Sequence, residues 1–140
     1  MAFSVWADAA ENPWSSTLGR TVVALGYMEP PEADTPGPFR LGDADRVRGL
    51  VESAGFASPI VDDVPLTWRN ASFDEYWQIT EDLSFTLATS LAKLGEAERA
   101  LLRSRVEEAL SVYAAEDGAL TMPGLTRNVL ARKAGSPPAG

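Results

Sequence analysis

The sequence predicts a mixed α/β chain with the order strand, helix, helix, strand, helix, helix, strand. Two observations predict this class. In four segments, apolar residues recur at helical spacing and the segment ends carry capping or stop signals. Three other segments are short and apolar or alternate at period two, as strands do. With a length of 140 residues, the chain is one domain or a piece of one.

The composition argues against several classes of function. The net charge is −8, and no basic patch is visible, so we expect no nucleic-acid partner. The chain has no cysteine and no histidine, which excludes disulfides, thiolate chemistry and Ser-His-Asp catalysis and makes a metal site unexpected. No stretch suits a membrane helix or a signal peptide, so we expect a cytoplasmic protein without a membrane partner.

A short apolar strand at residues 3–6 precedes the first helix. Asn12 is a good helix cap, Pro13 suits the first helical position, and Gly26 can stop the helix. A proline-rich loop follows at residues 28–39. The apolar stripe of this helix consists of Trp14, Leu18, Val22 and Leu25.

The second helix is predicted over residues 43–54, with Gly55 at its end, and the second strand over residues 59–68. Pro59 and Pro65 favour an edge position or a bulge for this strand. The apolar stripe of the helix consists of Val47, Leu50, Val51 and Ala54. One face of the strand carries Ile60, Val64, Leu66 and Trp68.

Two further helices are predicted within residues 72–115. A capping box at Ser72 and Glu75 opens the first, which Gly95 ends, and the second spans residues 96–115. The stripe of the first helix consists of Leu83, Leu87, Leu91 and Leu94, and that of the second of Leu102, Val106, Leu110 and Tyr113. A last strand over residues 125–132 and a flexible tail over 134–140 complete the chain.

Several short patterns occur in an order typical of one enzyme family. They are Val5-Trp6, Asn12-Pro13-Trp14, Pro36-Gly37-Pro38-Phe39, Asp45-Arg46-Val47-Arg48 with Ala54-Gly55-Phe56, Asp74-Glu75-Tyr76-Trp77, Met122-Pro123-Gly124 and Asn128-Val129-Leu130-Ala131-Arg132. In this order they resemble the C-terminal part of a class I S-adenosylmethionine-dependent methyltransferase of the small-molecule type. The resemblance extends from Phe3 to Lys133.

The resemblance implies that residues 1–133 are the C-terminal part of a doubly wound, Rossmann-like sheet. The strand at 3–6 matches the fifth strand of the family, and that at 59–68 the sixth or seventh. The strand at 125–132 is the last and completes an antiparallel edge hairpin on an otherwise parallel sheet. The helices within 72–115 match an insertion that forms a lid over the substrate.

S-adenosylmethionine is the cofactor that the resemblance implies for the complete enzyme. In the family, the glycine-rich loop and the ribose-binding acid precede the position of Phe3, so we expect no cofactor site in this chain. We therefore expect the chain to be inactive by itself. No catalytic residue is assigned, because methyl transfer from a sulfonium depends largely on positioning.

Four aromatic residues are candidates for binding a small-molecule substrate. Trp14 follows the first strand, at the strand end where open α/β sheets bind ligands. Trp68, Tyr76 and Trp77 lie with Phe73 at the start of the lid. The same residues also suit a hydrophobic core, and capping by itself explains Asn12-Pro13, so both interpretations stay open.

Two alternatives come from other functional classes. The exposed edge of the half-sheet at residues 3–6 suits a non-catalytic module that forms a homodimer. The aromatic cluster suits a binding protein for a small ligand.

Overall fold

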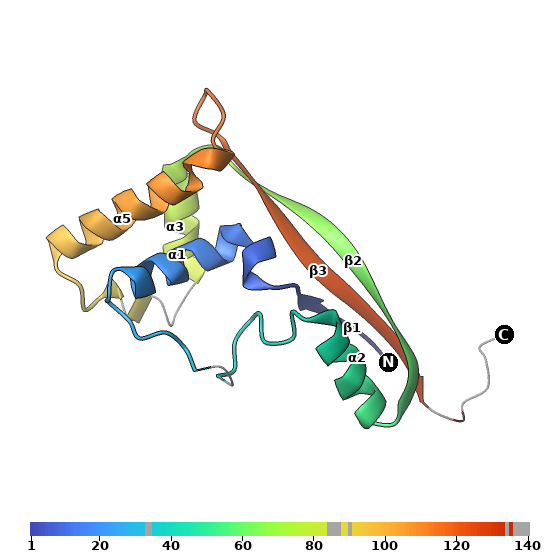
Figure 1. Ribbon diagram of the computed structural model, residues 1–140. Helices are drawn as coiled ribbons and strands as arrows, with labels where there is room; N and C mark the ends of the chain where they lie inside the picture. Colours follow the sequence, from blue (N-terminus) through green and yellow to red (C-terminus); the bar gives the residue numbers. More distant parts are fainter. Residues whose placement is uncertain (33–34, 84–87, 90, 134, 136–140) are drawn as a thin grey trace. The chain divides into compact units, whose positions relative to one another are not determined.

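The computed structural model describes residues 1–32, 35–83, 88–89, 91–133 and 135 (Figure 1). These residues form a mixed α+β structure with a three-stranded antiparallel sheet, so the predicted mixture of helices and strands is confirmed. In chain order the elements are β1 (Ala2–Trp6), the 3-10 helix η1 (Ala9–Glu11), α1 (Pro13–Ala24), α2 (Ala44–Ser53), β2 (Phe56–Asn70), α3 (Phe73–Leu83), α5 (Glu96–Leu110), the 3-10 helix η2 (Ser111–Tyr113) and β3 (Leu120–Lys133). Within the described part of the chain, no helix is long and apolar enough to cross a membrane.

The chain divides into two compact units, each with its own hydrophobic core. The sheet unit comprises Met1–Asn12, Ala33–Leu66 and Gly124–Gly140, and the helical unit comprises Pro13–Glu32 and Thr67–Pro123. Strands β2 and β3 contribute residues to both units. Of the predicted tail, only Gly135 belongs to the described residues.

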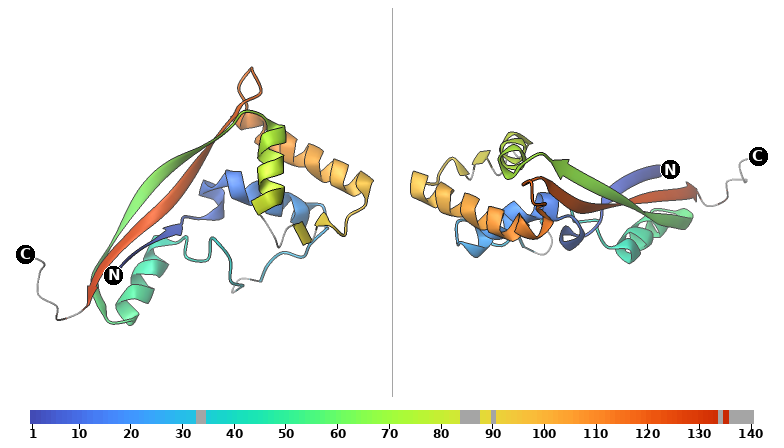
Figure 2. Two further views of the ribbon diagram at one scale, coloured as in Figure 1. Left: turned by 180° about the vertical axis from the view of Figure 1, so that it is seen from behind. Right: turned by 90° about the horizontal axis from the view of Figure 1, so that it is seen from above.

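In the sheet unit, β3 lies between β1 and β2. Strand β1 pairs antiparallel with β3, with Ala2 opposite Leu130 and Trp6 opposite Thr126. Helix α2 packs on one face of this sheet (Figure 2). The core between them consists of Val47, Val51, Val129 and Ala131, with Phe3, Val5, Leu41, Phe56 and Val61 packed around it.

Helix α2 begins and ends as its sequence predicts. The Asp43 side chain accepts a hydrogen bond from the Arg46 N–H at 2.6 Å, and Gly55 adopts a φ of +84° just beyond the helix. The prediction that Leu50 belongs to the buried stripe is wrong, because this side chain is 51% exposed. A single sheet face covers only a narrow arc of the helix, and Val47 and Val51 occupy that arc.

Strand β2 occupies an edge of the sheet, as its two prolines predict. The face that carries Ile60 and Leu66 is open, and these side chains are 54% and 36% exposed. Val61, one position away, packs instead against the α2 core. Since side chains alternate along a strand, the apolar stripe predicted for this segment faces away from α2.

In the helical unit, α1, α3 and α5 share one core, which confirms most of the predicted stripes. The stripe of α1 and its continuation at Leu25 lie in this core, as do Leu102, Val106, Leu110 and Tyr113 of α5 and η2. At the start of α3, the Ser72 hydroxyl accepts from the Glu75 N–H at 3.2 Å, as a capping box requires. The Glu75 carboxylate accepts from the Ala71 N–H at 2.5 Å.

The stripe predicted along α3 is wrong at Leu83, which is 74% exposed. The buried face instead carries Phe73, Tyr76 and Trp77. Leu83 lies six positions after Trp77 and therefore about 240° around the helix from it. Leu91 and Leu94 do join the core, and Leu87 lies outside the described residues.

Strand β3 begins five residues before the predicted start, at Leu120. Leu120 and Met122 alternate into the helical core, and further along Val129 and Ala131 alternate into the sheet core. Met122-Pro123-Gly124 therefore continues the strand and does not precede it.

Two neighbouring leucines of α5 provide a test of the helical core. Leu102 is fully buried and Leu101 is 43% exposed. We expect Leu102→Ala to lower the free energy of unfolding by about 2 to 5 kcal/mol, since it opens a cavity. The matched variant Leu101→Ala should lower the free energy of unfolding by less than about 1 kcal/mol. Urea unfolding followed by circular dichroism measures both, and equal losses would contradict the orientation of α5.

Candidate functional site

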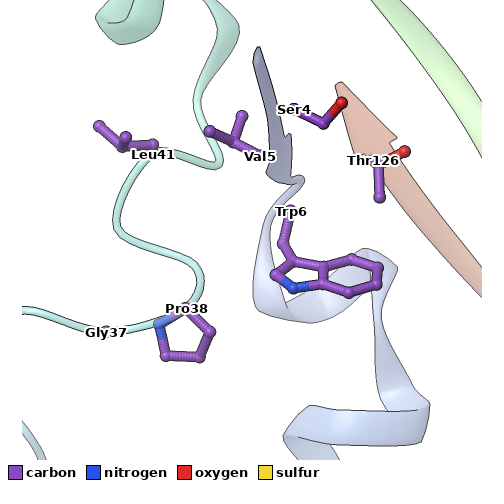
Figure 3. Close-up of a pocket in the computed structure, with 7 residues that line it drawn as sticks. All are labelled: Ser4, Val5, Trp6, Gly37, Pro38, Leu41 and Thr126. Atoms are coloured by element: carbon purple, nitrogen blue, oxygen red, sulfur yellow. The ribbon is translucent and has the colours of Figure 1, made fainter. Parts of the chain in front are cut away.

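A pocket of about 390 Å³ lies beside β1, at the end of the strand where the chain leaves the sheet (Figure 3). It is lined by Ser4, Val5, Trp6, Gly37, Pro38, Leu41 and Thr126. The pocket joins two sequence patterns, Val5-Trp6 and Gly37-Pro38, that lie about thirty positions apart in the chain. Its volume is within the range of about 300 to 1,000 Å³ typical of small-molecule sites.

Apolar side chains dominate the walls of the pocket. In Figure 3 the Trp6 indole lies between Pro38 and Thr126, and Val5 lies opposite Leu41. The two hydroxyl groups already have acceptors. The Ser4 hydroxyl donates to Asn128 Oδ1 at 2.7 Å, and the Thr126 hydroxyl donates to the Val64 carbonyl at 3.4 Å. The pocket therefore suits a ligand that is mainly apolar.

The loop that carries Leu41 is held close to the chain after β1. A Cβ atom at Gly42 would lie 2.5 Å from Asp8 Oδ1, 2.8 Å from the Asp8 nitrogen and 2.9 Å from the Ala7 carbonyl carbon. No side chain fits at such distances, so the close approach requires glycine. The contact places Leu41, the preceding residue, against the pocket.

Arg127 fixes the same loop from the sheet. Its side chain is almost fully buried and donates a hydrogen bond to the Gly42 carbonyl. Its Nε lies 3.0 Å from Asp63 Oδ1, and a second nitrogen lies 3.5 Å from Glu11 Oε2. A buried guanidinium needs such carboxylates, because burying an unpaired charge is costly.

Asn12 is fully buried and joins the chain after β1 to β3. Its amide nitrogen donates to the carbonyl oxygens of Asp8 at 3.2 Å and Leu125 at 3.0 Å. Its Oδ1 accepts from the Leu125 N–H at 3.0 Å. Helix α1 does begin at Pro13, directly after Asn12, as predicted. A capping role nevertheless does not account fully for Asn12. Its side-chain amide both donates to and accepts from the backbone of Leu125, as a paired residue of a neighbouring strand would.

The four predicted substrate-binding residues all belong to the helical unit. Trp14 and Trp68 stack on each other, with ring centroids 4.1 Å apart and planes inclined by 23°. Both are half-buried against the core of this unit. The Trp68 Nε1 is buried and has no hydrogen-bond partner in the described structure.

Tyr76 and Trp77 are buried beside Phe73, with ring centroids 5.9 and 6.0 Å from it. The Arg103 guanidinium lies 5.5 Å from the Phe73 ring centroid and 5.9 Å from that of Trp77, and it also forms an ion pair with Asp74. Burial raises the pKa of the Tyr76 phenol above 10.0. The structure thus brings the four residues into one hydrophobic core, and none of them lines the pocket beside β1.

Sequence reasoning missed Gly42 and Arg127. A signal for Arg127 was present, since it alternates with Val129 and Ala131 and so occupies the inward face of an apolar strand. A charged residue in such a position indicates a buried polar contact. The role of Gly42 depends on a contact with Ala7 and Asp8, and no local pattern reveals it.

A scan against models of known protein families found no match, and a search of curated proteins found none either. Across the described residues, no group of three or more Asp or Glu side chains is arranged to hold a metal ion.

Two glycines provide a matched test of the loop contact. We expect Gly42→Ala to destabilise the protein by about 1 to 3 kcal/mol, because the added methyl group overlaps Asp8 and Ala7. Gly49, inside α2, has open space around its Cβ position, and Gly49→Ala should stabilise by up to about 1 kcal/mol. Thermal unfolding of both variants distinguishes them. A tolerated Gly42→Ala would show that the loop is not held in this way.

Proposed function

We propose that this chain is the substrate-side, C-terminal region of an S-adenosylmethionine-dependent methyltransferase that acts on a small molecule. On this proposal the cofactor is bound by another part of the complete enzyme, and the chain by itself is inactive. The observation that carries the proposal is the pocket beside β1, where two of the family-like patterns meet.

The position of the pocket supports a ligand-binding role. Open α/β sheets bind ligands outside the carboxyl ends of their strands, and Trp6 is the last residue of β1. The walls are mainly apolar, and one side of the pocket belongs to a loop held by Gly42 and Arg127. Such a pocket orients an apolar acceptor and excludes water, and methyl transfer from a sulfonium requires mainly positioning.

The arrangement of strands also supports the proposal. The resemblance expects the last strand to form an antiparallel hairpin with its predecessor at the edge of a larger sheet. Strand β3 lies beside β2 and pairs antiparallel with β1. No described strand pairs with the outer side of β1, which is where the doubly wound sheet of the complete enzyme would continue.

The remaining parts of the proposal rest on sequence. On the same resemblance, the helices within 72–115 form a lid, and Trp14, Trp68, Tyr76 and Trp77 stay candidates for contact with the substrate. Since Tyr76 and Trp77 are buried in the core, this contact requires an opening of the helical unit. A cytoplasmic location is inferred from composition.

Calorimetry and the gene sequence test this proposal together. We expect no micromolar binding of S-adenosylmethionine to this chain, because it offers no glycine-rich loop for the cofactor. We also expect the reading frame upstream of Met1 to encode a strand followed by a G-x-G loop. Micromolar binding by the chain, or a stop codon and ribosome-binding site directly before Met1, would contradict the proposal.

A second candidate function is a homodimer formed along β1. The Met1 and Ala131 backbone groups bond each other, so the alternation of an antiparallel ladder directs the backbone groups of Ala2 and Ser4 away from β3. This edge carries no charge or proline, the usual protection against pairing with another chain.

Light scattering tests the dimer. We expect a mass of twice 15.0 kDa for the chain, and the monomer mass for Ser4→Pro, which removes an outward N–H group. The control Ser4→Ala keeps that group and should stay dimeric. A monodisperse monomer for the unaltered chain would contradict this candidate.

A further inference from the structure

A second hollow lies within the helical unit, along the junction of α1 and α5, which run side by side in Figure 1. Its volume is about 560 Å³. It is lined by Thr17, Arg20, Thr21, Ala24, Leu25, Arg105 and Ala109, and we call it the α1–α5 groove. It shares no residue with the pocket beside β1.

The helical period explains the shape of this groove. Positions 17, 20, 21, 24 and 25 share one side of α1 and its end, and positions 105 and 109 lie one turn apart on α5. The next positions of α5, Val106 and Leu110, are fully buried in the core. Ala24 and Ala109 are small, so they leave space above the helix junction and give the groove an apolar lining.

Arg20 differs from the paired arginines of the helical unit. Arg99 pairs with Glu81 at 3.1 Å. Arg103 pairs with Asp74. Arg20 lines the groove, and its side chain forms no hydrogen bond or ion pair with the described residues. Its guanidinium group therefore carries a charge that no acid among the described residues pairs with.

Arg105 contributes a second cation that a ligand can reach. It pairs with Glu108 at 2.9 Å, but both side chains are more than half exposed. Exposed pairs of this kind contribute little to stability, so an anion can share this guanidinium at small cost. Arg20, Arg105 and Glu108, the partner of Arg105, together carry a net charge of +1, which a single negative charge balances.

The hydrogen-bond donors that the groove offers to a ligand are the guanidinium groups of its two arginines. The Thr21 hydroxyl donates to the Thr17 carbonyl within α1 at 2.8 Å, so its proton is in use. A guanidinium presents two parallel N–H groups that match the two oxygens of a carboxylate.

We propose that the α1–α5 groove binds a small monocarboxylic acid with an apolar body. Its carboxylate lies between Arg20 and Arg105, and its apolar part lies on Ala24, Leu25 and Ala109. This site is independent of the proposed methyltransferase function, since the α1–α5 groove and the pocket beside β1 share no residue and the site only binds its ligand.

Titration calorimetry with octanoate, compared with 1-octanol, tests the site on the intact chain. We expect octanoate to bind at least about tenfold more tightly, because only the acid forms charge-assisted hydrogen bonds. Arg20→Gln should reduce octanoate affinity by about tenfold and leave 1-octanol unchanged. The matched control Arg99→Gln breaks an exposed ion pair elsewhere and should change neither.

A groove-filling variant tests the position of the apolar part. Ala109 is exposed, so Ala109→Phe should fold, as circular dichroism would verify, while it blocks both ligands. If Arg20→Gln disturbs folding, Arg20→Lys keeps the charge and should lose only part of the affinity. Equal binding of octanoate and 1-octanol, no effect of Arg20→Gln, or no octanoate binding would overturn the proposal. So would binding of an acidic peptide in place of octanoate.

Discussion

The pairing of β3 is the constraint on which the rest of the structure depends. Its first half buries Leu120 and Met122 in the helical core, and its second half buries Val129 and Ala131 in the sheet core. The strand separates β1 from β2, which come from distant parts of the sequence. A slip of one residue would turn every one of these side chains to the opposite face, so both cores hold the strand in a single register.

Buried polar groups give the sheet unit its specific geometry. Asn12 satisfies both the N–H and the carbonyl of Leu125, and Arg127 satisfies the carbonyl of Gly42. A buried group that loses its partner costs about 1 to 3 kcal/mol, so these bonds favour one arrangement of the loop and strand strongly. The pocket beside β1 is a consequence, because Leu41 and Thr126 in its walls directly adjoin the residues that these bonds hold.

The helical unit follows a different principle. Its aromatic side chains fill the core, and one of their polar atoms, Trp68 Nε1, is buried without a hydrogen-bond partner in the described structure. In this core, the packing of aromatic rings thus outweighs the cost of a buried polar atom that lacks a hydrogen bond. Arg20 and Arg105 line the α1–α5 groove, while the aromatic residues that the sequence indicates pack in the core of this unit.

The sequence by itself determined the type and the order of the local elements. Capping residues located the starts of α1, α2 and α3, glycines at positive φ located the ends of α1 and α2, and the stripes of α1 and α5 identified their buried faces. These features depend on neighbours within one or two turns, so a local pattern is sufficient to reveal them.

Tertiary structure decided which apolar faces are covered and which distant residues meet. The exposure of Leu50 and Leu83 follows from what packs on each helix, and no periodicity contains that information. The contacts of Gly42 with Asp8 and of Arg127 with Gly42 join segments more than thirty positions apart. Both the pocket beside β1 and the α1–α5 groove therefore became visible only in the folded chain, because each is built by segments that only folding brings together.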